Sequence, residues 1–145
     1  MLAVLLRLHS QNIRIRKMEN DKAKILVVED DLSSQQYYTI ILEDSYDLKI
    51  VSTVIEAKKA LGEVDFHMAI IDISLPGEEN GIDLIKFMEK EYPKKPRCIA
   101  LTAHAFPHTR VEALEVGAVE FFTKPIMSGV LIDSLEKHIK SLSDE

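Results

Sequence analysis

The chain of 145 residues contains no tryptophan and only one cysteine, Cys98, so it cannot form an internal disulfide. It also lacks internal repeats, low-complexity tracts and any stretch that reads as an interdomain linker. Because Cys98 lies in an apolar run, we expect a buried structural thiol rather than a reactive one. The length and the 46% hydrophobic content are those of one ordinary domain with its own core.

No hydrophobic run is long enough to cross a bilayer, which takes about 20 residues. Residues 2–6 are apolar, but no basic stretch precedes them and no clear cleavage site follows, so a signal peptide is not expected. With a single cysteine, these absences favour a reducing cytoplasm. Residues 1–22 are then an extra amphipathic helix, a membrane-surface or partner-binding arm, or a leader ahead of a natural start at Met18.

Positive charge is scarce outside the first 17 residues, which carry four basic residues and no acid. The remainder holds 14 basic and 24 acidic residues, a net charge near −10. Binding to nucleic acid depends mainly on Lys and Arg contacts with phosphate. The acidic body therefore argues against direct nucleic-acid binding.

Short apolar runs alternate with amphipathic stretches from residue 24 onward. Strands are predicted at residues 25–28, 48–51, 66–73, 98–101 and 119–123. Helices are predicted at 33–42 with Ser33 or Ser34 as N-cap, at 54–64, from residue 82, at 107–117 with Pro107 in the first turn and Gly117 as the C-terminal cap, and at 127–142. The apolar runs are continuous, as strands buried on both faces require. We therefore expect an α/β fold, a doubly wound parallel sheet with helices on both faces. Among such sheets we expect the flavodoxin-like (βα)5 type, whose known strand order is 2-1-3-4-5.

Groups able to do phosphate chemistry follow four of the five predicted strands. Glu29 and Asp30 follow the first, Asp72 ends the third, Thr102 follows the fourth and Lys124 follows the fifth. Ligands of open parallel sheets bind outside the carboxyl ends of the strands. In the expected order the first and third strands are neighbours, so their acids should converge.

Converging carboxylates repel each other, and Mg²⁺ is the natural compensating ion because it prefers oxygen ligands. We assign Asp72 as nucleophile, Asp30 as metal ligand and Glu29 as a ligand acting through water. Thr102 is then a hydroxyl donor to the phosphoryl group, and Lys124 is the cation that neutralises it. Each residue alone also fits a plain interpretation, such as a solvated helix turn or a surface lysine. Their appearance at successive strand ends makes the combination specific.

Four segments carry a resemblance to the response-regulator receiver family: ILVVEDD at 25–31, IIDISLP at 70–76, ALTA at 100–103 and FFTKP at 121–125. The resemblance covers about residues 24–142, within a receiver domain placed at 23–145. It implies that Asp72 accepts a phosphoryl group from the phosphohistidine of a histidine kinase or phosphotransfer protein. It also implies a Mg²⁺ ion held by Asp30, Asp72 and the backbone carbonyl of Ser74. The protein would then be a signalling phosphoacceptor and not an enzyme acting on other substrates.

The resemblance also implies a switch in which Thr102 couples to the aromatic residue Phe121. Phosphorylation would change the protein-binding surface around Phe121, for a downstream protein or a homodimer. Ser74 and His104 match the family's positions that tune phosphoryl lifetime, although His104 fits an exposed loop histidine equally well. Two departures stand out: the turn at residues 76–81 is one residue longer than the commonest form, and Phe121 replaces the frequent tyrosine.

Two alternatives remain. An aspartate-nucleophile phosphohydrolase needs a second Asp two residues after the nucleophile, but here that position is Ser74. A degenerate receiver would act only as a phosphorylation-independent binding module. The presence of all the expected site groups argues against lost chemistry.

Overall fold

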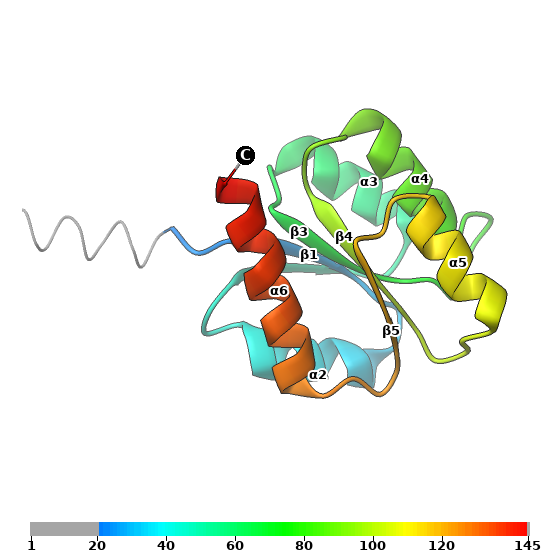
Figure 1. Cartoon of the computed structure of the whole chain (residues 1–145), viewed down its shortest axis with the longest axis horizontal. Coiled ribbons are helices and arrows are strands. Elements are labelled where there is room, and N and C mark those ends of the chain that lie inside the picture. The colour runs from blue at the N-terminus through cyan, green and yellow to red at the C-terminus, as the bar shows by residue number, and fades with distance from the viewer. Residues whose placement is uncertain (1–20, 145) are drawn as a thin grey trace, which may run out of the picture.

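Strands and helices alternate along the part of the chain that the computed structural model describes, residues 21–144 (Figure 1). The strands are β1 (Lys24–Val28), β2 (Asp47–Val51), β3 (Met68–Asp72), β4 (Arg97–Thr102) and β5 (Glu120–Thr123). The helices are α2 (Leu32–Leu42), α3 (Val54–Glu63), α4 (Gly81–Glu91), α5 (Pro107–Glu115) and α6 (Ser128–Ser143). The strands form a parallel sheet of order β2-β1-β3-β4-β5, which confirms the predicted fold class. The interpretations of the N-terminal extension concern residues 1–22, of which residues 1–20 lie outside the described residues.

Helices cover both faces of the sheet, as its continuous apolar strands require (Figure 1). Side chains of β1 alternate between two cores, with Leu26 and Val28 on one face and Ile25 and Val27 on the other. The first core packs against α3, α4 and α5, and the second packs against α2 and α6. Among residues 21–144, no helix is long and apolar enough to cross a membrane.

Several element boundaries differ from the predicted ones by a few residues. The side chain of Asp31, not of Ser33 or Ser34, caps α2 by accepting a hydrogen bond from the Ser34 backbone N–H at 2.9 Å. The prediction of a serine cap was therefore wrong, because the last acid of the 29–31 run already fills that role. β3 is shorter than the apolar run that marks it, since the run continues into the turns at both ends.

The ends of α5 confirm two predictions based on single residues. Pro107 occupies its first turn, where a missing backbone N–H costs nothing. Gly117 follows its C-terminus with a φ of 128°, a conformation that favours glycine. A Cβ there would also lie 2.7 Å from Oε2 of Glu89.

The single thiol lies in the core, as predicted. Cys98 is 4% exposed on β4, and its Sγ lies 3.8 Å from Sδ of Met88. Burial raises the pKa of the Cys98 thiol to about 12, and the charge of Glu89 adds to this effect. Because the thiolate is the reactive form, the thiol should be inert in the folded protein.

We expect a maleimide to leave the folded protein unlabelled while labelling one thiol per chain in denaturant. The change in rate should be about a thousandfold or more, given an ordinary thiol pKa near 8.5. Mass spectrometry of the labelled chain measures the effect. Rapid stoichiometric labelling without denaturant would contradict the buried position of Cys98.

Candidate functional site

The pairing register of the central strands brings the predicted acids together at the carboxyl edge of the sheet. Val28 of β1 lies opposite Ile71 of β3, so the next residues, Glu29 and Asp72, stand side by side. Both side chains are almost fully buried, with 1% of Glu29 and 6% of Asp72 exposed. Asp30, one residue farther along, is exposed at the rim of the same edge.

The predicted hydroxyl and cation come from the next two strands. Thr102 ends β4 and pairs with Thr123 of β5. The following residue, Lys124, donates its backbone N–H to the carbonyl of Thr102 at 2.9 Å. Because all the strands run parallel, the predicted groups reach one edge of the sheet although they are far apart in sequence.

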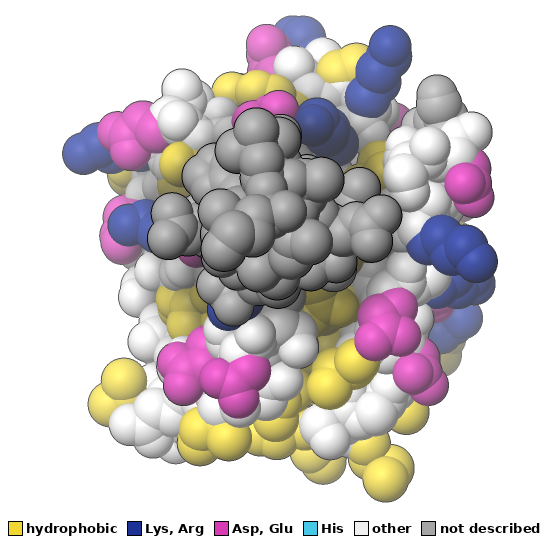
Figure 2. All heavy atoms as spheres, turned by 90° about the vertical axis from the view of Figure 1, so that its left-hand side faces the viewer, with side chains coloured by type: hydrophobic (Ala, Val, Ile, Leu, Met, Phe, Trp, Pro, Cys, Tyr) yellow, Lys and Arg dark blue, Asp and Glu magenta, His cyan; other side chains and the backbone are white. Residues whose placement is uncertain are grey.

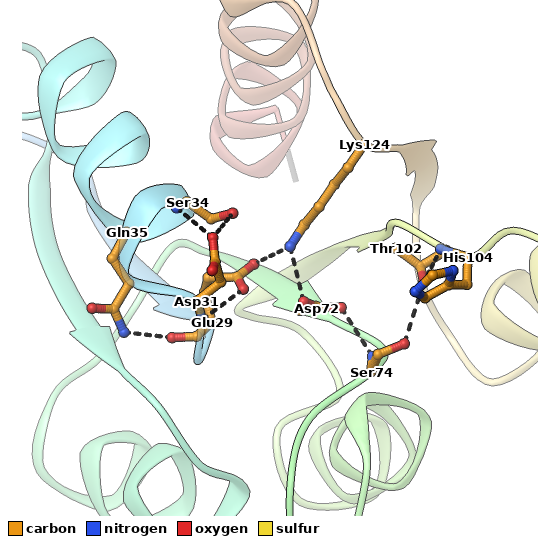
Figure 3. Close-up of polar contacts among 9 residues, drawn as sticks. All are labelled: Glu29, Asp31, Ser34, Gln35, Asp72, Ser74, Thr102, His104 and Lys124. Atoms are coloured by element: carbon orange, nitrogen blue, oxygen red, sulfur yellow. Dashed lines mark hydrogen bonds and ion pairs between the residues drawn. The ribbon is translucent and has the colours of Figure 1, made fainter.

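The Lys124 side chain reaches across the site and lies between two carboxylates (Figure 3). Its Nζ donates hydrogen bonds to Oε2 of Glu29 at 2.5 Å and to Oδ2 of Asp72 at 2.9 Å. Burial alone would lower the pKa of Lys124, but the hydrogen bonds and negative charges of Glu29 and Asp72 outweigh it and raise the pKa. The ammonium therefore stays charged and compensates the two acids.

The pKa of Glu29 is raised above its ordinary value. Burial is the largest cause, and the negative charge of Asp72 acts in the same direction. Hydrogen bonds from Lys124 and from the backbone N–H of Asp31 act against it without cancelling it. The site thus holds more negative charge than one lysine compensates, which is the condition that favours a bound cation.

Three carboxylates at this edge are close enough to share a metal ion. One oxygen each from Glu29, Asp30 and Asp72 lies within 4.8 Å of the others. An all-oxygen donor set with one exposed member suits Mg²⁺, which keeps several of its waters when bound to carboxylates. The donor chemistry therefore fits the predicted ion, and the assignment of individual ligands stays a prediction.

The backbone after β3 holds Asp72 in a defined orientation. The Ser74 backbone N–H donates to Oδ1 of Asp72 at 2.9 Å, which leaves Oδ2 facing Lys124. Ser74 Oγ lies 3.5 Å from Oγ1 of Thr102, within hydrogen-bond reach. Ser74 is thus placed beside both groups, and its part in phosphoryl lifetime stays a prediction.

His104 is tied to the site by its backbone. The backbone N–H of His104 donates to Oγ1 of Thr102 at 3.2 Å, and its ring belongs to an exposed loop (Figure 3). The exposed ring fits a loop histidine, and its part in phosphoryl lifetime stays a prediction.

The predicted switch residue Phe121 is buried in this structure, with 6% of its surface exposed. It belongs to the core on the α3, α4 and α5 face. The guanidinium of Arg110, from α5, lies 5.9 Å from the centre of its ring. The predicted coupling of Phe121 to Thr102 stays a prediction.

One residue important for the geometry of the site, Gly81, is not among the site residues predicted from the sequence motifs. Gly81 begins α4, and a Cβ on it would lie 2.3 Å from the carbonyl oxygen of Asp72 and 2.6 Å from Cα of Ile73. Its backbone N–H also donates to the carbonyl of Ile73 at 3.0 Å. Only a residue without a side chain allows α4 to start this close to the acceptor. A glycine after Asn at a helix start was the available signal, but it does not reveal the contact.

Two side chains of α2 also reach site segments. Gln35 Nε2 donates to the carbonyl of Glu29 and to Oγ of Ser52. The Tyr37 hydroxyl donates to the carbonyl of Ile126, two residues after Lys124. The sequence carries no sign of the Tyr37 contact, because Tyr37 and Ile126 are 89 positions apart.

Comparison with known proteins agrees with this geometry. The family model described as "Response regulator receiver domain" matches residues 25–136. The response regulator protein PilR of Pseudomonas aeruginosa is 30% identical over 111 residues, which span 76% of this chain and 24% of that protein. A CheY-like receiver domain protein from Methanospirillum hungatei superposes with a TM-score of 0.79 at 26% identity, covering 85% of this chain and 98% of that one.

A second solved structure is the beryllofluoride-activated NtrC4 receiver domain dimer. It superposes with a TM-score of 0.76 at 28% identity and covers 82% of this chain and 98% of that one. The family model spans well over half of the sequence, and the relatives and solved structures agree with it. The chain belongs to the response regulator receiver domain family of two-component systems.

Proposed function

We propose that this receiver is an active phosphoacceptor and that Asp72 takes a phosphoryl group from a histidine kinase or a histidine phosphotransfer protein. The observation that carries the proposal is the Lys124 ammonium held between the buried carboxylates of Glu29 and Asp72. A degenerate binding module has no need to bury two acids around a cation, since burying charges is costly. The intact arrangement therefore favours chemistry over a purely structural role.

The transfer follows from the groups around Asp72. A carboxylate oxygen of Asp72 attacks the phosphorus of the donor's phosphohistidine, forming a P–O bond as the P–N bond breaks. The electron pair of the broken bond stays on the imidazole of the donor. Lys124 lies where it can neutralise charge on the incoming phosphoryl oxygens, and the Thr102 hydroxyl can donate to one of them.

Glu29, Asp30 and Asp72 would hold Mg²⁺ through their carboxylate oxygens, and the family resemblance adds the backbone carbonyl of Ser74. When bound, the ion supplies positive charge beside the phosphoryl oxygens and offsets the repulsion among the acids. Asp30 is the exposed member of the group, so it is the acid that an arriving hydrated ion meets first. Glu29 is already hydrogen-bonded to Lys124, which agrees with a contact made through water.

Acetyl phosphate with Mg²⁺ is expected to add one phosphoryl mass to the protein. Asp72→Asn should abolish the gain, because an amide oxygen is a poor nucleophile. Asp133→Asn, an exposed acid on α6, is the matched control and should phosphorylate like the wild type. Intact-mass spectrometry measures all three proteins. An unchanged wild-type mass, with Mg²⁺ binding shown separately, would refute the phosphoacceptor proposal.

The proposed output is contact with a protein through the face formed by α5, β5 and α6. Three apolar side chains at or on α5 are exposed: Phe106, the residue just before the helix, and Val111 and Leu114 within it. The acidic charge of the chain beyond residue 17 argues that this contact is with protein and not with nucleic acid. We place the protein in the cytoplasm, where its phosphoryl donors act.

Beryllofluoride, a phosphoryl mimic, should promote self-association or the capture of a target by this face. Val111→Lys should weaken that response, because it puts a charge into an apolar contact. Ile55→Lys on α3 is the control, since Ile55 is 82% exposed on a helix that is not part of this face. Light scattering with and without beryllofluoride tests for a homodimer, and pull-downs test for a target. Equal behaviour in both conditions by both methods would count against the output face.

A further inference from the structure

Helix α2 contacts two parts of the phosphoacceptor site: the turn that carries the acids Glu29 and Asp30, and the segment that carries Lys124. Gln35 and Tyr37 are two positions apart on an α-helix, so they project in nearly opposite directions, about 200° around its axis. Gln35 faces the side of β2, where it lines a groove with Leu32 and Ile50. Tyr37 faces the other side, where it lines an apolar pocket with Lys124 and other residues of the segment after β5.

The Gln35 side chain joins the acid-bearing turn to the edge of the sheet. Its Nε2 donates to the backbone carbonyl of Glu29 at 2.5 Å and to Oγ of Ser52 at 3.1 Å. The Glu29 backbone N–H donates in turn to the carbonyl of Val51. The peptide group between Glu29 and Asp30 is thus held by Gln35, and the orientation of the exposed Asp30 depends on it.

The Tyr37 side chain holds the opposite half of the site. Its hydroxyl donates to the backbone carbonyl of Ile126 at 2.8 Å, in a partly buried position. Ile126 is buried, and Lys124 lies two residues earlier on the same short connection between β5 and α6. The other anchor of this connection is the bond from the Lys124 N–H to the Thr102 carbonyl. Tyr37 therefore limits how far the base of the Lys124 side chain can move from Asp72.

We propose that Gln35 and Tyr37 are positioning residues, Gln35 for the metal-binding acids and Tyr37 for the phosphoryl-neutralising lysine. The proposal rests on the phosphoacceptor function above and adds residues that act through Glu29, Asp30 and Lys124 without touching the phosphoryl group. It makes α2 the element that keeps the two charged halves of the site in register. Each contact is one hydrogen bond or a pair, so each should matter by a few-fold and not absolutely.

Two variants remove the contacts with little change in shape. Gln35→Met should weaken Mg²⁺ binding about three- to tenfold, while phosphorylation at saturating Mg²⁺ stays near the wild-type rate. Tyr37→Phe should do the opposite, slowing phosphorylation at saturating Mg²⁺ about three- to tenfold with Mg²⁺ affinity unchanged. If either residue had a purely structural role, its variant would lower Mg²⁺ affinity and phosphorylation rate together.

The experiment measures Mg²⁺ affinity by amide chemical shifts and phosphorylation rate with acetyl phosphate by intact mass. The controls are Gln36→Met, an exposed neighbour on α2, and Tyr92→Phe, at the far end of α4. Hydrogen exchange of the Lys124 amide supplies a readout independent of phosphorylation, and Tyr37→Phe should speed it at least threefold over Tyr92→Phe. Denaturant unfolding of every variant checks that stability differences do not set the result.

Three outcomes overturn the positioning roles: variants equal to their controls, losses in both quantities together, or Lys124 exchange unaffected by Tyr37→Phe. A wild-type protein that gains no phosphoryl mass would defeat the proposed function instead. In that case Mg²⁺ affinity of Gln35→Met and Lys124 exchange of Tyr37→Phe still decide the positioning roles. Failure of one proposal is therefore distinguishable from failure of the other.

Discussion

Gly81→Ala is expected to lower the free energy of unfolding by about 3 kcal/mol and to disable phosphorylation in whatever fraction remains folded. The added Cβ would lie 2.3 Å from the carbonyl oxygen of Asp72 and 2.6 Å from Cα of Ile73. Both are backbone atoms of β3 and the turn after it, so they cannot rotate away as a side chain would. Relief requires α4 to retreat or the acceptor backbone to move, and either displaces Asp72 from Lys124.

Gly62→Ala supplies the matched control, because a Cβ at Gly62 has nothing within 4 Å. Gly62 lies within α3, where replacing glycine with alanine stabilises a helix by up to about 1 kcal/mol. The same substitution should thus have opposite signs at the two glycines. Urea unfolding followed by circular dichroism measures both, and a Gly81→Ala protein as stable as the wild type would contradict the close approach.

Lys124→Met is expected to slow phosphorylation by acetyl phosphate about 100- to 1,000-fold, the usual cost of losing one preorganised charge or donor in a site. It should also lower metal-free stability at neutral pH by about 3 kcal/mol, because it leaves Glu29 and Asp72 buried without their cation. Mg²⁺ should restore part of that stability, since the ion replaces some of the missing charge. Lys49→Met, on an exposed side chain of β2, is the control and should change neither quantity appreciably.

The stability loss in Lys124→Met should shrink on acidification. Burial raises the pKa of Glu29 in the folded protein, and removing Lys124 takes away an influence that lowers it. The folded state then binds more protons than the unfolded state, so stability falls as pH rises through the window above the ordinary glutamate pKa of about 4.3. Below that window Glu29 is protonated in both states and its penalty disappears. If the stability loss in Lys124→Met changed with neither pH nor Mg²⁺, its cause would not be electrostatic.

The fold was predictable because its signals are local and repeated. The central strands β1, β3 and β4 are built on continuous apolar runs, and the run that contains Ile70 and Ile71 is buried as expected. Glu29, Asp72, Thr102 and Lys124 were predictable as one site for a similar reason: parallel strands carry their carboxyl ends to one edge. Helix caps were less predictable, since Asp31, Ser33 and Ser34 can all cap a helix and only the backbone conformation chooses among them.

The supporting residues were not predictable from the sequence. Tyr37 and Ile126 meet across 89 positions through one side-chain hydroxyl and one backbone carbonyl, and neither residue type indicates the other. Gly81 looks like an ordinary start of a helix until the distance to the Asp72 backbone is known. Such contacts depend on how the helices pack on the sheet, which periodicity does not specify.

The ammonium of Lys124 meets a carboxylate 95 positions earlier in the chain, and the other site groups come from strands in between. A short peptide around Asp72 therefore lacks the groups that surround it in the folded protein. Under the proposed function, a nascent or misfolded chain has the aspartate but not the acceptor, because its cation and hydroxyl are elsewhere. Under that proposal, a phosphoryl donor would react only with folded molecules, because the cation and the hydroxyl reach Asp72 only when the sheet has formed.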